Sequence, residues 1–190
     1  MKKILIFCAI TLNLFAEEAK VPMTGDAAPD AAVRTADGEA VTLAALTKDT
    51  PTVLVFYRGG WCPYCNQHLA GLTEIEAEIQ EKGYQIIAIS PDRPEKVAEA
   101  AENATFKYRL LSDSDMNAAK AYGLAFTLAE DMVTRLQGFG IDVEAASGRD
   151  HHMLPVPAVI VIDGDGVIRF RHADEDYTER LSNEALLQSL

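Results

Sequence analysis

The chain is organised around the stretch Phe56-Tyr57-Arg58-Gly59-Gly60-Trp61-Cys62-Pro63-Tyr64-Cys65-Asn66-Gln67-His68-Leu69. An apolar run over residues 52–57 leads into it, and a Gly-Gly pair breaks that run. A proline follows the first cysteine, where it suits the first turn of a helix. Two cysteines separated by two residues, where a strand passes into a helix, are typical of a redox-active dithiol. The stretch therefore predicts a strand, a turn and a helix that begins at Cys62 and Cys65.

Length and composition describe one globular domain. The chain has 190 residues, of which 48% are apolar, with ordinary amounts of Gly and Pro. That is long enough for a single domain with a substantial hydrophobic core. The formal net charge is −12. Because such a surface repels nucleic acid and anionic membranes, neither is expected as a partner.

The first sixteen residues have the pattern of a secretory signal peptide. Lys2 and Lys3 form a positive start, residues 4–14 are almost entirely apolar, and Ala16 is a candidate cleavage point. The apolar run is shorter than the ~20 residues that span a bilayer. An uncleaved N-terminal anchor is the alternative. We therefore predict a signal peptide over 1–16 and an exported protein, periplasmic or extracellular, without stable membrane association once the signal is removed.

Removal of this segment would leave Cys62 and Cys65 as the only cysteines, because Cys8 lies within it. It would also remove two of the 17 basic residues and none of the 29 acidic ones, which changes the net charge from −12 to −14. A disulfide between residues so close in sequence removes little unfolded-state entropy. A single CxxC in an exported protein thus indicates redox chemistry more than a structural staple.

The remaining chain divides into a flexible lead-in over 17–30, rich in Ala, Pro and acids, and a domain over 31–190. From apolar periodicity and turn residues we predict, in order, strands over 32–35 and 40–43, a helical turn over 43–46, a strand over 52–57, a helix from Pro63 to Gly83, a strand over 85–90, a helix over 95–103, a strand over 107–111, a short helix up to Tyr122 capped by Asp113 or Ser114, strands over 159–162 and 167–172, and a closing helix over 179–190.

Residues 124–154 do not fit a tight connection between strands. A helix is expected over 127–137 and irregular chain over 141–153. Connections of this length in compact domains are usually functional. The segment is therefore expected to be a functional flap or a covering insertion.

This order of elements resembles the thioredoxin fold over residues 22–190. Three segments, 56–65, 154–157 and 162–170, resemble the peroxiredoxin-like branch of the alkyl hydroperoxide reductase and thiol-specific antioxidant family. The resemblance implies an α/β, thioredoxin-like fold with a central mixed sheet flanked by helices. It also implies an N-terminal hairpin and an insertion before a strand that follows a cis-proline.

Carried onto this sequence, the family's layout makes Cys62 the peroxide-attacking cysteine and Cys65 the resolving thiol. Pro157 matches the cis-proline of thioredoxin-like proteins, which packs opposite the active cysteine. In the family a Pro and a Thr or Ser stand seven and three residues before that cysteine, where this chain has Val55 and Gly59. The family's active-site Arg falls at Pro157. The Cys-Pro-Tyr-Cys tetrad itself resembles glutaredoxins, so the site also looks partly like that of a disulfide reductase.

Both chemistries need Cys62 as a thiolate. At the start of a helix its sulfur would face unpaired N–H groups and the positive end of the helix dipole. Arg58 could add a positive charge if the Gly-Gly turn folds back, and both effects lower the pKa of Cys62. Pro63 would shape the first helical turn, and Trp61 would either cover Cys62 and offer partners an apolar contact or fill local core. The alternatives for the cysteines are a buried inert pair and a metal pair.

Four other features have both a functional and an ordinary interpretation. His68 could face the cleft and act in catalysis, or face solvent. Since His and Met are suitable copper or zinc ligands, residues 150–153 (Asp-His-His-Met) are either a metal site or, the better expectation, a solvated loop. Residues 163–166 resemble a calcium loop but lack the downstream Glu, which favours a hairpin turn. The acids at 174–176 are expected to be surface charge rather than acid–base catalysts.

The sequence therefore predicts a thiol oxidoreductase that needs no metal and no organic cofactor. In the first hypothesis it reduces peroxides: Cys62 becomes a sulfenic acid, Cys65 condenses with it, and an external thiol donor such as a thioredoxin-like protein reduces the disulfide. In the second it exchanges protein disulfides through a mixed disulfide. The third, non-enzymatic alternative is a copper-handling protein that uses both cysteines and the His151-His152 loop.

Overall fold

The structure is a computed structural model that describes residues 20–102 and 107–190, so the expected signal peptide over 1–16 lies outside the described residues. The strands are β1 (Ala32–Arg34), β2 (Ala40–Thr42), β3 (Thr52–Phe56), β4 (Gln85–Ser90), β5 (Arg109–Ser112), β6 (Ala125–Thr127), β7 (Met153–Pro155), β8 (Ala158–Ile162) and β9 (Ile168–Ala173). The helices are α1 (Leu43–Thr47), α2 (Pro63–Glu81), α3 (Pro94–Glu102), α4 (Asn117–Ala121), α5 (Glu130–Gly138), α6 (Val143–Ser147) and α7 (Asn183–Gln188). The N-terminal hairpin, the central strand and the long helix fall where the sequence predicts them.

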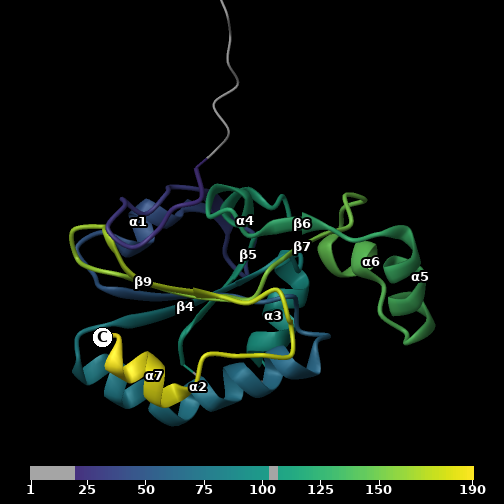
Figure 1. The fold of residues 1–190 in the computed structure, drawn as a ribbon. Coiled ribbons are helices and arrows are strands. Elements are labelled where there is room, and N and C mark those ends of the chain that lie inside the picture. Colours follow the sequence, from purple (N-terminus) through teal and green to yellow (C-terminus); the bar gives the residue numbers. More distant parts are fainter. Residues whose placement is uncertain (1–19, 103–106) are drawn as a thin grey trace, which may run out of the picture.

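Within the described residues, a seven-stranded mixed sheet forms the centre of the molecule (Figure 1). Its strand order is β2-β1-β5-β4-β3-β8-β9. β3 lies between β4, to which it is parallel, and β8, to which it is antiparallel. All of β3 is buried. A strand covered on both faces has no face to keep polar, which is why this segment is apolar without alternation.

Helices cover both faces of the sheet. α2, α3 and α7 lie on one face, and α1 and α4 lie on the other (Figure 1). α2 buries Leu69, Leu72, Ile75 and Ile79 against the sheet. These residues recur at the helical period, so α2 is an amphipathic helix with its apolar stripe directed at β3 and its neighbours. The fold is α/β with a central mixed sheet flanked by helices, as predicted. None of the helices in the described residues is long and apolar enough to cross a membrane.

The part of the expected flexible lead-in that the structure describes, residues 20–30, is instead bound to the domain. The N–H of Gly25 donates to the carbonyl oxygen of Ile168 at 2.8 Å. The N–H of Ala28 donates to the carbonyl oxygen of Gly166, also at 2.8 Å. This segment therefore continues the edge of the sheet beside the turn that precedes β9.

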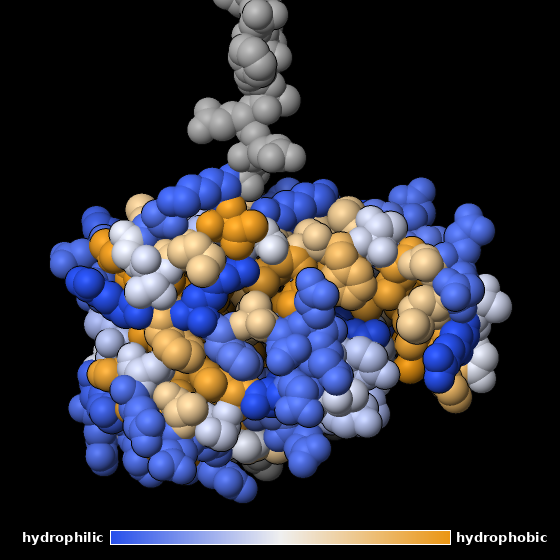
Figure 2. Space-filling view, in the orientation of Figure 1, coloured by the Kyte–Doolittle hydropathy of each residue, from blue (hydrophilic) through white to orange (hydrophobic). Residues whose placement is uncertain are grey.

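Residues 124–154 form a compact insertion. β6 and β7 pair as a separate antiparallel two-stranded sheet, and α5 and α6 lie beyond them (Figure 1). On the face that Figure 2 shows, apolar residues gather over β6, β7 and the insertion helices. The insertion has an apolar cluster of its own, which comprises Leu128, Val133, Leu136, Val143 and Leu154. The predicted helix is present as α5, with a later start.

Two predictions in this half of the chain are corrected. Residues 141–153 are not irregular, because α6 lies within them. The side chain of Asp142 caps α6 by accepting a hydrogen bond from a backbone N–H of its first turn at 2.9 Å. The closing helix is shorter than predicted, because α7 begins after Ser182, whose hydroxyl caps it in the same way at 3.2 Å. Residues 179–182 therefore belong to the connection between β9 and α7.

Candidate active site

Cys62 ends the turn after β3 and is the N-cap residue of α2. Its backbone is extended, with φ −92° and ψ 114°, and Pro63 follows as the first helical residue. Cys65 lies in the first turn of the helix. Both cysteines are free thiols and both are buried, with 2% and 0% of their surfaces exposed. The spacing thus places both thiols at the buried N-terminus of α2.

The two thiols differ in acidity. The hydrogen bond that the Cys65 side chain donates to Cys62 is the largest cause that lowers the pKa of Cys62 to about 6. Burial opposes this shift, while the Cys65 backbone N–H and the charges of Arg58 and Arg180 add to it. The same side-chain hydrogen bond, together with burial, raises the pKa of Cys65 far above its ordinary value. At neutral pH Cys62 is therefore mainly a thiolate and Cys65 a thiol.

Two guanidinium groups bring positive charge to the dithiol. Arg58 is buried, and its guanidinium carbon lies 5.2 Å from the centre of the Trp61 ring and 4.1 Å from that of Tyr177. Arg180 lies in the connection before α7, and its Nη2 donates to Cys65 Sγ at 3.5 Å. No sequence pattern indicates Arg180, which lies 115 residues after Cys65 and belongs to no local motif.

Trp61 joins the dithiol to the insertion. Its ring packs against the buried cluster that contains both cysteines. The ring also packs against the apolar cluster of the insertion. Of the two sequence interpretations of Trp61, this packing fits a core residue that links two parts of the fold.

The turn that presents Cys62 is held by Asp92, which follows β4. Its Oδ2 accepts a hydrogen bond from the N–H of Gly60 at 2.7 Å. Burial raises the pKa of the Asp92 carboxyl group to about 6. Gly59 has φ +139°, which L side chains rarely adopt, and a Cβ atom there would lie 2.4 Å from Trp61 Nε1 and 2.8 Å from Asp92 Oδ1. The glycine at the place of the family's Thr or Ser is therefore required by this turn.

The prediction that Pro157 is cis is wrong, since the described residues contain no cis peptide bond. Trans is the preferred isomer of X-Pro bonds, with only ~5–6% cis in folded proteins. The N–H of Val156 donates to Leu124 O at 2.8 Å, which continues the β6–β7 pairing and keeps the chain extended into Pro157. Next along the chain, Ala158 pairs with Phe56 at the end of β3. Pro157 therefore still lies at the end of the sheet where β3 passes into the turn before Cys62.

His68 lies on α2, one turn beyond Cys65. Burial is the largest cause that lowers the pKa of His68 to about 4, and Arg180 and His172 add to the shift. The imidazole is therefore neutral at pH 7. Its Nε2 has no hydrogen-bond partner within the described residues, and the same holds for His172 Nε2. A catalytic role for His68 gains no support from these contacts.

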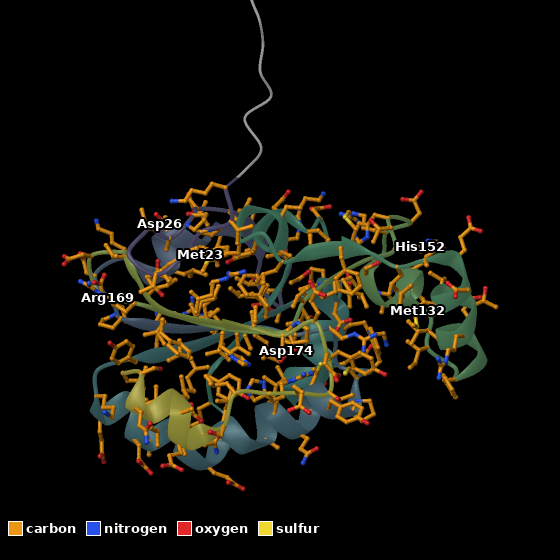
Figure 3. All side chains as sticks on the ribbon, in the orientation of Figure 1. Met23, Asp26, Met132, His152, Arg169 and Asp174 are labelled. Atoms are coloured by element: carbon orange, nitrogen blue, oxygen red, sulfur yellow. The ribbon has the colours of Figure 1, made fainter. Side chains whose placement is uncertain are left out.

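The His151-His152 loop is occupied by local contacts. His151 Nε2 lies 2.9 Å from Ser114 O, and His152 Nε2 lies 2.6 Å from Glu144 Oε1. His152 lies within the insertion, away from α2 (Figure 3). In the described part of the chain, no group of three or more His, Cys, Asp or Glu residues is placed to hold a metal ion. The structure therefore does not bring this loop together with the cysteines.

Acidic residues in the two remaining candidates shape turns. Asp163 accepts hydrogen bonds from two backbone N–H groups of its own turn and pairs with Arg169 at 2.6 Å, so residues 163–166 are a hairpin turn as predicted. Asp174 and Asp176 each accept a hydrogen bond from the N–H two residues further on, at 2.9 Å. Asp174 lies on the side of the sheet that α2 and α7 cover (Figure 3).

A dithiol at the start of the first long helix, beside the central strand of a mixed sheet, defines a thiol-dependent redox site on a thioredoxin fold. The profile of the AhpC/TSA family matches residues 24–171. The chain belongs to this family.

Several known proteins are similar to this chain. Peroxiredoxin Bcp of Escherichia coli is 31% identical over 100 residues, which cover 53% of this chain and 64%, less than two thirds, of that protein. The chloroplastic peroxiredoxin Q of Oryza sativa subsp. japonica is 28% identical over 169 residues, which cover 87% of this chain and 67% of that one. The crystal structure of peroxidoxin BcpB from Mycobacterium tuberculosis has a TM-score of 0.69 at 24% identity, covering 88% of this chain and 96% of that one. It shares the fold described above.

The acidity of Cys62 can be measured through its reactivity. Because the thiolate is the nucleophile, alkylation of Cys62 by iodoacetamide should be slow in acid, rise with a midpoint near pH 6, and be nearly maximal at neutral pH. Cys65→Ala should move the midpoint upward, since it removes the largest stabilising hydrogen bond. Mass spectrometry of a chain with Cys8 replaced by Ser follows the reaction. A wild-type midpoint near the ordinary thiol value of about 8.5 would contradict this assignment.

The turn before Cys62 should tolerate a methyl group at one glycine and not at the other. Gly59→Ala should lower the free energy of unfolding by ~1–3 kcal/mol, because the backbone is strained and Trp61 must move. Gly60→Ala is the matched control, since its Cβ would meet Asp92 Oδ2 at 3.7 Å and Ala100 Cβ at 3.9 Å, which are ordinary contacts. Urea unfolding followed by the fluorescence of the single Trp measures both variants. Equal stabilities would show that the turn does not need this conformation.

Proposed function

We propose that this protein is a thiol-dependent peroxidase in which Cys62 attacks the peroxide and Cys65 resolves the product. The observation that carries the proposal is the opposite shift of the pKa values of two neighbouring thiols. Cys62 is a thiolate that can attack at neutral pH, and Cys65 stays protonated until the resolving step. Membership of the AhpC/TSA family and the similarity to named peroxiredoxins support this function.

The reaction follows from the arrangement of the two sulfur atoms. Cys62 Sγ attacks one peroxide oxygen, the S–O bond forms as the O–O bond breaks, and the leaving oxygen takes a proton to become water or an alcohol. Cys65 then loses its proton and attacks Cys62 Sγ, a disulfide forms, and water leaves. The thiols already share a hydrogen bond, so the second step begins from contact. We propose that an external thiol donor reduces the disulfide.

The guanidinium groups replace donors that the family's pattern would place elsewhere. Gly59 has no side-chain hydroxyl, and Pro157 has neither a cation nor an N–H to offer a peroxide. Arg58 and Arg180 are the cations that lower the pKa of Cys62. Positive charge fixed beside the attacking sulfur would also stabilise the negative charge that develops on the leaving oxygen.

The second candidate is thiol–disulfide exchange with protein disulfides. The observation that favours it is the placement of both thiols in one turn at a helix start, in a Cys-Pro-Tyr-Cys tetrad. In this reaction the Cys62 thiolate would form a mixed disulfide with a substrate cysteine, and Cys65 would release it. The copper-handling alternative gains no support from the described residues.

Single substitutions of the cysteines separate these functions. Cys62→Ser should reduce peroxide consumption to the uncatalysed rate. Cys65→Ala should turn over peroxide several-fold more slowly than the wild type, because its sulfenic acid must wait for the external thiol and cannot form the Cys62–Cys65 disulfide. Cys8→Ser is the control and should match the wild type. Peroxide consumption with a thiol donor and reduction of insulin disulfides are measured in parallel. Insulin reduction that depends on Cys62, without peroxide turnover, would replace the first function by the second.

We also propose that the protein acts after export, in the periplasm or outside the cell. The support is the positive start and apolar run over residues 1–16, followed by acidic residues. Expression of the whole chain in a bacterium, with cell fractionation and intact mass, tests this. The expected product lacks the first residues and lies in the periplasmic fraction. Full-length mass in the membrane fraction would favour the anchor, and full-length mass in the cytoplasm would contradict export.

A further inference from the structure

The charges of Arg58 and Arg180 are balanced in a way that depends on the redox state. Arg58 is only 6% exposed, and its Nε has no hydrogen-bond partner within the described residues. Among the ion pairs of the described residues, neither guanidinium pairs with a carboxylate. Buried charges are ordinarily paired. Arg180 is half-buried, and its Nη1 donates to the carbonyl oxygens of Tyr177 and Glu179 at 2.6 Å. The anion that both guanidinium groups stabilise is the Cys62 thiolate.

The neighbouring side chains do not supply a second counter-ion. His68 lies near both Arg180 and His172, and both histidines carry buried Nε2 atoms without a hydrogen-bond partner within the described residues. Asp176 is the acid whose carboxylate interacts with Arg180, but it is exposed and already accepts hydrogen bonds from the N–H and hydroxyl of Thr178 at 2.9 and 2.7 Å. The positive charge at the dithiol therefore depends on the thiolate for its balance.

Oxidation removes that balance. When Cys62 and Cys65 form a disulfide, the thiolate is lost, while both guanidinium groups remain beside the sulfur atoms. An unbalanced buried charge is costly, so an anion that enters at this point stabilises the oxidised state. We propose that Arg58 and Arg180 recruit the carboxylate of an incoming reductant to the oxidised dithiol, and that this reductant is a small thiol with a carboxylate close to its sulfur.

Access to the dithiol favours a small reductant over a protein. Both sulfur atoms are buried, and the outer cover of Arg58 is the ring of Tyr177. Tyr177 as a residue is 42% exposed, and its ring meets the ring of Tyr64 edge-on at 5.8 Å between centroids. The Nε of Arg58 is buried beneath this ring, so even a small anion reaches it only when the Tyr177 ring moves aside. A protein thiol would first have to displace this aromatic pair.

The chemistry of the reduction is ordinary thiol–disulfide exchange. A first thiolate attacks Cys62 Sγ, the Cys62–Cys65 bond breaks, and Cys65 leaves as a thiolate that takes one proton. A second thiolate attacks the sulfur of the bound reductant, which restores the Cys62 thiolate and releases the disulfide of the small thiol. Two thiols are oxidised and one protein disulfide is reduced. The restored Cys62 thiolate again balances the charges of both arginines. The carboxylate of the oxidised reductant is then no longer attracted to them, and the product leaves.

The test compares thiols that differ in charge. The chain with Cys8 replaced by Ser is oxidised with diamide, which forms the disulfide without peroxide. Thioglycolate, 2-mercaptoethanol and cysteamine then reduce it, followed by the fluorescence of Trp61 and by counting free thiols. After correction for the thiolate fraction of each reagent, thioglycolate should react about tenfold faster than 2-mercaptoethanol. A tenfold ratio corresponds to about 1.4 kcal/mol, which is within the attraction between two opposite charges in contact near a protein surface. Cysteamine should be slowest.

The variants identify the source of the preference. Arg58→Gln combined with Arg180→Gln should abolish it, and Arg135→Gln, an exposed position on α5, should retain it. Should the paired variant not fold, the wild type still provides a second measurement, since raising NaCl from about 0.02 M to about 0.5 M should weaken the preference several-fold by screening.

Two outcomes would overturn the inference: equal corrected rate constants for the three thiols in the wild type, or a preference that persists in the folded paired variant. The inference rests on the proposed function only because peroxide turnover would make the oxidised dithiol. Peroxide consumption is therefore measured on the same samples. A charge preference without peroxide turnover would refute the proposed function alone.

Discussion

The negative charge on Cys62 is the constraint on which the rest of the site depends. A buried thiolate is unstable unless hydrogen bonds and cations replace its lost hydration. Three parts of the fold do so: the first turn of α2 brings the Cys65 donor, the turn after β3 brings Arg58, and the connection after β9 brings Arg180. They meet because β3, β8 and β9 are consecutive in the sheet. The strand order thus places the end of the chain beside the start of α2.

The sequence predicts those features whose causes are local. β3 is apolar without alternation because both of its faces are covered, and its five residues show this directly. α2 shows a helical apolar period, a Pro at its first position and a Gly after its end, so its bounds follow from capping and periodicity. The length of residues 124–154 alone indicates an insertion. Cys62 and Arg58 are identifiable because they lie in one short stretch with the helix start.

The features that the sequence does not predict depend on contacts between distant segments. Nothing near Arg180 indicates that it touches a residue 115 positions earlier. Tyr177 stacks on Arg58 only because β9 ends beside the dithiol. α6 is too short for a periodic pattern, and its formation depends on the cap that Asp142 provides. The cis-proline expectation relied on resemblance, and the bond before Pro157 has the ordinary trans form.

The departure of this site from the family's pattern at Gly59 has a physical cause. The turn before Cys62 needs the positive φ of Gly59, and a side chain there would collide with Trp61 and Asp92. This turn cannot therefore also carry the family's Thr or Ser. The same turn lets Trp61 reach the insertion and brings Arg58 back to the dithiol. The guanidinium hydrogen bond at the dithiol runs from Arg180 to Cys65 Sγ. The Cys62 thiolate therefore depends first on the hydrogen bonds from Cys65 and second on the charges of both arginines, and not on a side chain at position 59.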